Sequence, residues 1–279
     1  MLKCGITGWS GVLGIAIRKE LNYRFIPFKE RIENKKNIYR WVKNNNFDII
    51  IHLAAVVPTK IVNSNFNKAN KINYDGTKNI VDAILKYKPN LKWFFFSSTS
   101  HVYKLKKIFG KIDEKTTTFA STKYGLTKLR AENYIVNKLK NTTVRYCIGR
   151  IFSYSGINQK QPYLIPSLIY KIKASKDKYI HFKDLNHYRD FLSLKKICTA
   201  INILRKKKAS GIYNIASGKS FLLEDIAKYI GKKFKKKCKL KKNKKTFLIG
   251  NIDKLNKLGF SSNENFYKII DEIIKINEK

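Results

Sequence analysis

The sequence predicts an α/β fold, a Rossmann-type doubly wound parallel sheet with a smaller C-terminal lobe. Two observations predict it. Over residues 2–151, short apolar runs alternate with stretches of helical periodicity, the pattern of parallel strands joined by helices. A glycine-rich turn, residues 5–11, stands between the first apolar run and the first helical stretch. A chain of 279 residues is long enough for one good-sized domain with a smaller appendage.

The N-terminal elements follow from apolar content and period. The run Ile49-Ile50-Ile51 is typical of a parallel strand covered on both faces. In the first helix, Val12, Leu13 and Ile17 supply apolar positions. Ligands of such sheets bind beyond the carboxyl ends of the strands. We expect strands at 2–7, 23–28, 47–54, 93–97 and 143–151, and helices at 8–21, 38–44, 73–87 and 123–140.

The alternation loosens after Phe152. We expect residues 1–155 to form the main domain, residues 190–215 to return to it, and residues 156–189 and 216–279 to form the smaller lobe. Within residues 156–279, helices are expected at 165–174, 194–204, 222–230 and 265–276, and strands at 179–182 and 211–215.

The formal net charge is +40, with lysines spread along the whole chain. That spread favours a general compositional bias over a dedicated acidic partner, and no nucleic-acid-binding motif is present. Binding of nucleic acid or another polyanion stays open as an alternative. The densest stretch is 232–245, where ten of fourteen residues are lysine.

Apolar runs are too short to span a bilayer, and the N-terminus lacks the pattern of a secretory signal. We therefore expect a cytoplasmic protein with no membrane insertion. Cys4, Cys147, Cys198 and Cys238 are scattered and match no zinc-binding spacing, so we expect no metal site.

The glycine-rich turn has the strand–turn–helix setting that a dinucleotide phosphate requires. We expect Gly5 to permit the tight turn, Gly8 to let the backbone approach a pyrophosphate, and Gly11 to permit close helix packing. The helix N-terminus then favours the anion. The alternative is a tight turn without a ligand.

The glycine spacing resembles the TGxxGxxG loop of the extended branch of the short-chain dehydrogenase/reductase superfamily. Further segments resemble the family in chain order and cover nearly the whole sequence. They are His52-Leu53-Ala54-Ala55, Asn73-x-x-Gly76-Thr77, Ser97-Ser98-x-x-x-Val102-Tyr103, Tyr124-x-x-x-Lys128, Arg189-Asp190-Phe191 and the stretch 211–218.

The resemblance implies a nicotinamide cofactor on the main domain and a nucleotide-sugar substrate held by the smaller lobe. It also implies a homodimer formed through the helices around residues 80 and 130. The cofactor-binding residues that it implies are Gly5, Thr7, Gly8, Trp9, Ser10, Gly11, Leu53, Ala54, Ala55, Asn73, Tyr124, Lys128 and Phe152.

Tyr124 and Lys128 carry the chemistry. A lysine one helical turn from a tyrosine can stabilise the phenolate, so that Tyr124 exchanges a proton with a substrate oxygen. By resemblance, Lys128 also holds the cofactor ribose, and the Thr99 hydroxyl binds the substrate. The alternative for Thr99 is to satisfy backbone groups at a strand end.

The chain departs from the related 4,6-dehydratases after this threonine. Those enzymes carry an Asp-Glu pair there, and this chain has Ser100 and His101. The carboxylates for water elimination are therefore absent. His101 falls where related epimerase-reductases place a catalytic cysteine, and a histidine could act there as acid or base. The alternative is simple contact with substrate or solvent.

NADP(H) is favoured over NAD(H), because Lys29 and Arg31 at the end of the second strand could bind a ribose 2′-phosphate. Glu30 lies between them and argues the other way. For the substrate pyrophosphate the candidate is Arg189, whose alternative is an ion pair with Asp190.

Two further substrate contacts come from the resemblance alone. One is Ser153 at the edge of the smaller lobe, and the other is an unspecified lysine within 241–245.

These residues predict an enzyme that reduces a 4-keto sugar nucleotide with hydride from NADPH, Tyr124 donating the proton. The alternative is a 4-epimerase that retains NAD and oxidises and re-reduces one carbon. Net consumption of NADPH distinguishes the two reactions.

Overall fold

The computed structural model describes residues 1–57, 59–120, 122–241 and 244–278. Within these residues, six parallel strands form the central sheet in the order β10-β5-β4-β3-β1-β2. Because β2 lies on one side of β1 and β3 on the other, the winding reverses at β1, which leaves a crevice at the carboxyl ends of the strands. The strands are β1 (Lys3–Thr7), β2 (Arg24–Pro27), β3 (Ile49–His52), β4 (Trp93–Thr99), β5 (Tyr146–Ile151) and β10 (Gly211–Ile215). The predicted Rossmann-type fold is confirmed.

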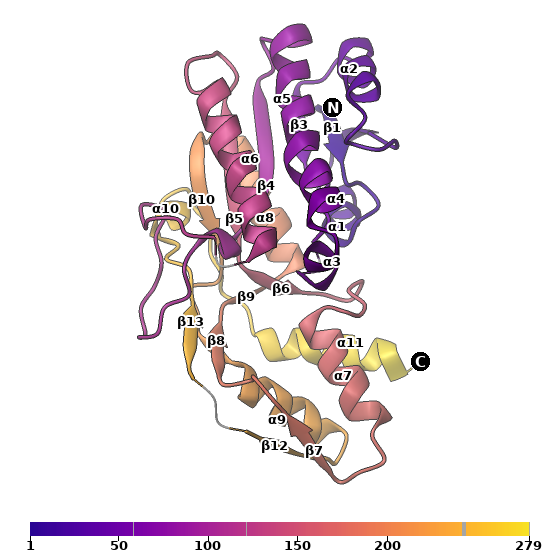
Figure 1. Ribbon diagram of the computed structural model, residues 1–279, viewed down its shortest axis with the longest axis vertical. Helices are drawn as coiled ribbons and strands as arrows, with labels where there is room; N and C mark the ends of the chain where they lie inside the picture. The colour runs from indigo at the N-terminus through magenta and orange to yellow at the C-terminus, as the bar shows by residue number, and fades with distance from the viewer. Residues whose placement is uncertain (58, 121, 242–243, 279) are drawn as a thin grey trace.

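Helices cover both faces of the sheet (Figure 1). Side chains of a strand alternate between the two faces of a sheet, so the isoleucine run of β3 has apolar side chains to bury on both faces. One face carries α1 (Val12–Glu20) and α8 (Leu194–Lys206), and the other carries α2 (Lys35–Asn44), α5 (Gly76–Tyr87) and α6 (Lys123–Leu139). Ile49 and Ile51 belong to the hydrophobic core under α1 and α8, and Ile50 belongs to the core under α2, α5 and α6.

The smaller lobe has its own hydrophobic core, formed between helices and short strands (Figure 1). Its helices are α7 (Leu164–Ala174), α9 (Leu223–Lys233) and α11 (Phe266–Glu278). β7 (Tyr179–Phe182) pairs with β12 (Lys237–Leu240), and β8 (His187–Arg189) lies between β11 (Phe221–Leu222) and β13 (Thr246–Leu248). β6 (Ser153–Ser155) pairs with β9 (Phe191–Ser193) between the lobe and the sheet.

Several boundaries and short elements differ from expectation. The first helix begins at Val12 and not at residue 8, because Gly8 has a φ of +67° and Gly11 is the extended N-cap. The helix expected from residue 73 opens as a π-helical turn, η1 (Lys71–Asp75). Short elements that periodicity did not predict are α3 (Thr59–Ser64), α4 (Phe66–Asn70), η2 (Ser100–Val102), α10 (Asp253–Asn256), β6, β8, β9, β11, β12 and β13.

The lysine-rich stretch contributes to regular structure in its described part. It supplies the end of α9 and then β12, in which Cys238 faces α9 while lysines flank it. The Cys238 thiol lies 3.2 Å from the carbonyl oxygen of Ala227. Residues 242 and 243 lie outside the described part. In the portion of the chain that the structure describes, no helix combines the length and apolar character needed to cross a bilayer.

Candidate active site

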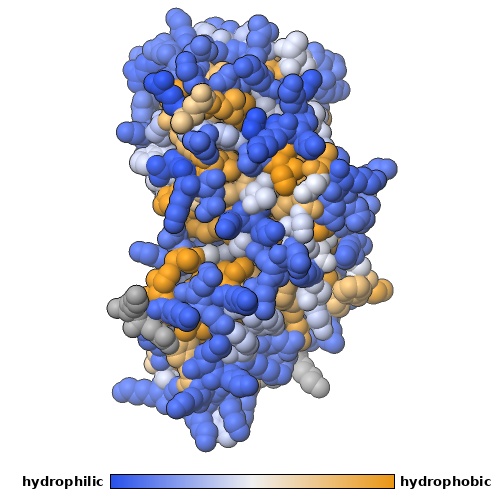
Figure 2. All heavy atoms as spheres, turned by 180° about the vertical axis from the view of Figure 1, so that it is seen from behind, coloured by the Kyte–Doolittle hydropathy of each residue, from blue (hydrophilic) through white to orange (hydrophobic). Residues whose placement is uncertain are grey.

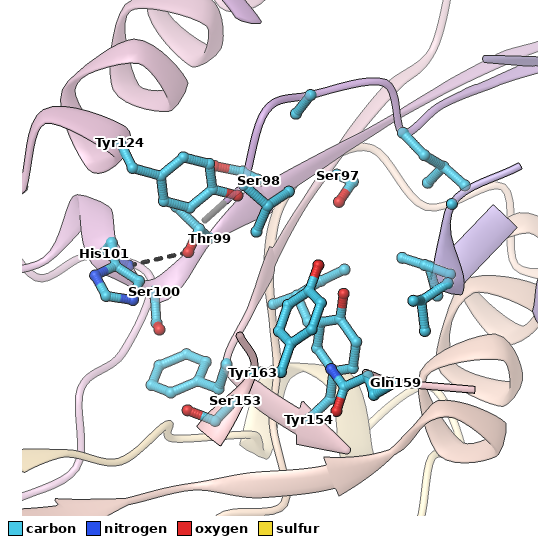
Figure 3. Close-up of a pocket in the computed structure, with 18 of the residues that line it drawn as sticks. Ser97, Ser98, Thr99, Ser100, His101, Tyr124, Ser153, Tyr154, Gln159 and Tyr163 are labelled. Atoms are coloured by element: carbon cyan, nitrogen blue, oxygen red, sulfur yellow. Dashed lines mark hydrogen bonds between the residues drawn. The ribbon is translucent and has the colours of Figure 1, made fainter. Parts of the chain in front are cut away.

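A cleft of about 470 Å³ opens at the carboxyl ends of β1, β4 and β5, next to the smaller lobe. It runs from the N-terminus of α1 to the start of α6. Of the expected cofactor residues, Gly8, Gly11, Leu53, Ala54, Ala55, Tyr124 and Phe152 line it, together with Thr99, His101 and Ser153 (Figure 3).

The turn between β1 and α1 is built from glycines, but their roles differ from expectation. Gly5 lies inside β1, where an added Cβ would meet Trp41 at 3.0 Å, so it does not form the turn. At Gly8 the backbone is left-handed, and a Cβ would lie 2.7 Å from the Ala54 nitrogen. The glycine that permits close helix packing is Gly14, because a Cβ there would overlap the Gly8 carbonyl oxygen. A Cβ at Gly11 would lie 3.3 Å from the same oxygen.

This turn fits a dinucleotide phosphate. Gly8 and Gly11 present backbone without side chains to the cleft, and Gly14 lets α1 approach the turn closely. The first turn of α1 holds no acidic residue, so the positive end of the helix faces the cleft unopposed.

A buried histidine fixes the wall formed by Leu53 and Ala54, which packs against the turn at Gly8. The Thr7 hydroxyl lies 2.6 Å from His52 Nδ1 and accepts from the amides of Leu53 and Ala54 at 3.2 Å each. His52 Nε2 lies 3.0 Å from the Thr77 hydroxyl. Burial, followed by the charge of Lys128, lowers the His52 pKa well below its usual range. Thr7 and neutral His52 therefore position the wall and do not themselves line the cleft.

Asn73, expected to contact the cofactor, is fully buried away from the cleft. Its Oδ1 accepts from the Val56 amide at 2.7 Å, and its Nδ2 donates to the Thr127 hydroxyl at 3.0 Å. The Thr127 hydroxyl donates in turn to the Tyr124 carbonyl oxygen at 2.8 Å. Asn73 thus connects the cleft wall to the helix turn that carries Tyr124.

Thr99 and Tyr124 meet in the cleft because β4 ends where α6 begins. Thr99 is the last residue of β4, and Tyr124 lies in the first turn of α6, which is capped by the Thr122 side chain. Their side chains share a hydrogen bond, and the Thr99 hydroxyl accepts from the His101 amide at 3.3 Å. The His101 ring lies edge-on to Tyr124, with centroids 6.0 Å apart (Figure 3).

The pKa values of Tyr124 and Lys128 differ from the expectation that Lys128 stabilises a Tyr124 phenolate. Burial raises the pKa of Tyr124, and the neighbouring Tyr163 adds to the rise. Burial lowers the pKa of Lys128 to about 7, and Glu132 opposes that shift. The Lys128 ammonium lies 4.2 Å from the centroid of the Phe96 ring. In the protein alone, Tyr124 is therefore neutral.

A buried network of charged side chains lies behind the cleft, and no pattern in the sequence predicted it. Glu132, four residues after Lys128, receives two side-chain nitrogens of Arg150, the closer at 2.7 Å. Ser98 donates to the same carboxylate. Arg150 also donates to the Tyr103 hydroxyl at 2.8 Å. This ion pair joins α6 to β5 and holds a negative charge near Lys128.

At the end of β2, positive charge gathers around Trp9. The Lys29 ammonium lies 5.9 Å and the Arg18 guanidinium 5.0 Å from the Trp9 ring centroid. Glu30 accepts from Arg40 at 3.4 Å. These residues, like the exposed Ser10 and Arg31, lie outside the lining of the cleft.

Arg189 lies on β8, outside the lining of the cleft. Its guanidinium donates to the Thr246 hydroxyl at 3.1 Å, and burial lowers its pKa to about 10. The alternative of an ion pair with Asp190 is wrong, because Asp190 accepts from the Ser217 amide at 2.6 Å and the Gly218 amide at 2.9 Å. Among the described side chains, no carboxylate forms an ion pair with Arg189.

Burial lowers the pKa of His101, and the charge of Arg189 lowers it further. His101 is therefore neutral near pH 7. Sequence reasoning missed Tyr154, Gln159 and Tyr163, which also line the cleft (Figure 3). They come from β6 and the irregular segment after it, where no periodic pattern marks them.

The cleft lining contains no aspartate or glutamate among the residues that the structure describes. Its polar chemistry consists of hydroxyls, one imidazole and one amide. This composition suits proton exchange with a carbinol or ketone, and it lacks the carboxylate pair for removing water.

Comparison with known proteins identifies the family. A sequence profile described as GDP-mannose 4,6 dehydratase matches residues 15–273. The chain belongs to this family. It is thus an extended short-chain dehydrogenase/reductase and an enzyme of the nucleotide-sugar dehydratase/epimerase group. GDP-6-deoxy-D-talose 4-dehydrogenase of Aggregatibacter actinomycetemcomitans is 24% identical over 234 residues, covering 81% of this chain and 78% of that protein.

Solved structures of this superfamily share the fold at low sequence identity. The structure of RMD from Pseudomonas aeruginosa complexed with NADPH has a TM-score of 0.86 and 17% identity, covering 99% of this chain and 98% of that one. UDP-glucose 4-epimerase of Thermus thermophilus, in complex with NAD, has a TM-score of 0.86 and 14% identity, covering 99% of both chains. These likenesses show the fold, and the two neighbours differ in the cofactor that they hold.

Proposed function

We propose that this enzyme reduces a 4-keto sugar nucleotide, using NADPH as hydride donor and Tyr124 as proton donor. The observation that carries the proposal is the Thr99–Tyr124 pair in a cleft whose described lining has no carboxylate. A dehydratase needs an acid and a base to remove water, whereas carbonyl reduction needs one proton donor besides the hydride source. The relative that acts as a sugar 4-dehydrogenase supports chemistry at this carbon.

The side chains have separate tasks in this reaction. The hydroxyls of Thr99 and Tyr124 hydrogen-bond to the ketone oxygen, and Tyr124 gives up its proton as the alkoxide forms. NADPH would supply the hydride, and Gly8 and Gly11 of the turn would hold it together with Leu53 and Ala54, which line the same cleft. Lys128 holds the ribose and places positive charge on the Tyr124 side of the cleft, which lowers the cost of forming the phenolate.

Two features support NADPH over NADH. Lys29, beside Trp9, and Arg31, two residues further along the chain, supply positive charge after β2 for a 2′-phosphate. Glu30, the carboxylate that could bind a free 2′-hydroxyl, is already held by Arg40.

Arg189 binds the pyrophosphate of the substrate, since its guanidinium has no carboxylate partner in the described chain. Ser153 lies on the same side and contacts the sugar.

The second candidate is a 4-epimerase with retained NAD. The Thr99–Tyr124 pair serves it as well, because oxidation and re-reduction of one carbon use the same proton-exchanging hydroxyl. The test offers the purified enzyme a 4-keto sugar nucleotide with NADPH, and separately a pair of 4-epimeric sugar nucleotides without added cofactor. Net loss of NADPH absorbance equal to product formed supports reduction. Interconversion of the epimers with no net change in cofactor would establish the epimerase.

A further inference from the structure

The segment 104–111 exposes large apolar side chains outside the cleft. Its sequence is Lys104-Leu105-Lys106-Lys107-Ile108-Phe109-Gly110-Lys111, and Ile108 and Phe109 are 81% and 62% exposed. Figure 1 shows the segment standing away from the sheet beside β13, and Figure 2 shows apolar atoms projecting at the edge where it lies. Adjacent exposed apolar side chains of this size mark a surface that contacts something. We call residues 106–111 the 106–111 loop.

The loop is held on a firm base. The Lys106 amide donates to the Phe247 carbonyl oxygen at 3.1 Å, and the Phe247 amide donates back at 2.8 Å. The Lys106 ammonium closes the neck by donating to the Lys111 carbonyl oxygen at 3.1 Å. Ile112, directly after the loop, is fully buried. The apolar tip is therefore presented in a fixed conformation.

Phe109 extends an aromatic stack out of the smaller lobe. Its ring meets Phe247 edge-on at 5.8 Å, and Phe247 stacks on Tyr188 at 4.8 Å. Despite this contact, most of Phe109 remains accessible. The tip is thus anchored by one edge of the Phe109 ring, and the outer face of that ring is exposed to a partner.

The positive charge of the segment 104–111 indicates which class of partner suits it. The segment 104–111 contains four lysines and no acidic residue. Apolar tips surrounded by lysines suit an anionic lipid surface, where rings and alkyl groups enter the interface and ammonium groups meet phosphates. A second copy of this chain would bring the same lysines and a net charge of +40 against them.

We propose that the 106–111 loop docks the enzyme on an anionic membrane surface. Ile108 and Phe109 enter the headgroup region, and Lys104, Lys107 and Lys111 bind lipid phosphates. This contact is peripheral and is independent of the reaction in the cleft. It fits a chain whose sequence holds no apolar run long enough to span the bilayer.

The test is vesicle cosedimentation of the full chain at physiological salt. It compares phosphatidylcholine vesicles with vesicles that also contain phosphatidylglycerol. The test variant is Ile108→Ser/Phe109→Ser, which removes the apolar tip and keeps every charge. The matched control is Tyr170→Ser on α7, since Tyr170 is 63% exposed and far from the loop in sequence. Circular dichroism melting checks that each variant folds.

We expect wild type and the Tyr170 variant to bind the anionic vesicles, and the double variant to partition about tenfold or more weakly. Equal binding by all three would show that the general charge alone attracts lipid, and it would overturn the proposal. Absence of wild-type binding to either vesicle would also overturn it. Lipid-free self-association that the double variant abolishes would assign the loop to a second copy instead.

Discussion

Two hydroxyls and an imidazole gather where β4 ends and α6 begins. Thr99, His101 and Tyr124 are close because a strand end and a helix start meet at one edge of the sheet. Burial keeps Tyr124 protonated and His101 neutral, so the site holds a proton to give. In the proposed reaction, the Lys128 ammonium offsets the negative charge of the phenolate as it forms.

Tyr124→Phe removes that proton donor and leaves the ring in place. We expect turnover with a 4-keto sugar nucleotide to fall by about 10²–10⁴-fold, because one acid/base group contributes about that much. NADPH affinity, measured by fluorescence titration, should stay near that of wild type. Turnover close to the wild-type rate would remove Tyr124 from the mechanism.

The lowered pKa of Lys128 predicts that the stability of the cofactor-free protein depends on pH. Its folded-state pKa is about 7, below its ordinary value of about 10.4, so the unfolded chain binds more protons between these values. Stability should therefore rise with pH above about 7, by up to about 1.4 kcal/mol per pH unit.

The measurement is urea denaturation of wild type and Lys128→Met between about pH 7 and 8.5, where ionisation of the cysteines, with an ordinary pKa of about 8.5, contributes equally to the two proteins. The methionine variant cannot gain or lose this proton, so its stability should rise less over the same interval. Parallel slopes for the two proteins would contradict the lowered pKa.

At the scale of elements, the β1–α1 turn depends on Gly14 more than on Gly11. A Cβ at Gly14 would overlap the Gly8 carbonyl oxygen, whereas a Cβ at Gly11 would be tight but tolerable. We expect Gly14→Ala to lower the free energy of unfolding by about 2 kcal/mol, because overpacking exceeds the helix-propensity gain of about 1 kcal/mol.

Gly11→Ala is the matched control and should change stability by less than about 1 kcal/mol. Both are compared by urea denaturation, with NADPH titration alongside. Equal effects of the two substitutions would show that α1 does not pack on the turn as described. Gly8→Val should also destabilise the fold, because the backbone φ at this position is +67° and the added Cβ would meet Ala54.

The end of β2 sets the choice of cofactor in this account. Lys29→Ala/Arg31→Ala should weaken NADPH binding far more than NADH binding, because only NADPH carries the 2′-phosphate. The difference should shrink as salt rises, since these exposed charges are screened over about 8–10 Å near physiological salt. Titrations with both cofactors at low and moderate ionic strength measure it. Equal losses, or a wild-type preference for NADH, would overturn the NADPH assignment.

At the scale of the whole molecule, regular periodicity predicted the central sheet and its covering helices. Ile49-Ile50-Ile51 indicated a strand buried on both faces, and the structure places the three side chains in two cores. Residues 211–215 were expected as a strand and form β10. In the smaller lobe, the strand expected at 179–182 forms β7, whereas β8, β11, β12 and β13 were missed, because elements of two to four residues carry little measurable period.

Motif spacing predicted which side chains of the site meet, but not what supports them. Thr99 and Tyr124 follow from strand-end and helix-start positions. The Glu132–Arg150 ion pair had no signal, because a helix residue and a strand residue 18 positions apart share no pattern. Asn73 resembled a cofactor ligand, yet its bonds are internal, which only three-dimensional contacts reveal.

The central claim is hydride transfer from external NADPH to the sugar carbonyl carbon. The most direct test supplies NADPH deuterated at the transferred position, together with a 4-keto sugar nucleotide, and locates the label in the product by nuclear magnetic resonance. We expect one deuterium on carbon 4 for each NADPH oxidised, and loss of this transfer in Tyr124→Phe. Product that forms without the label, through hydrogen returned from a retained cofactor, would contradict it.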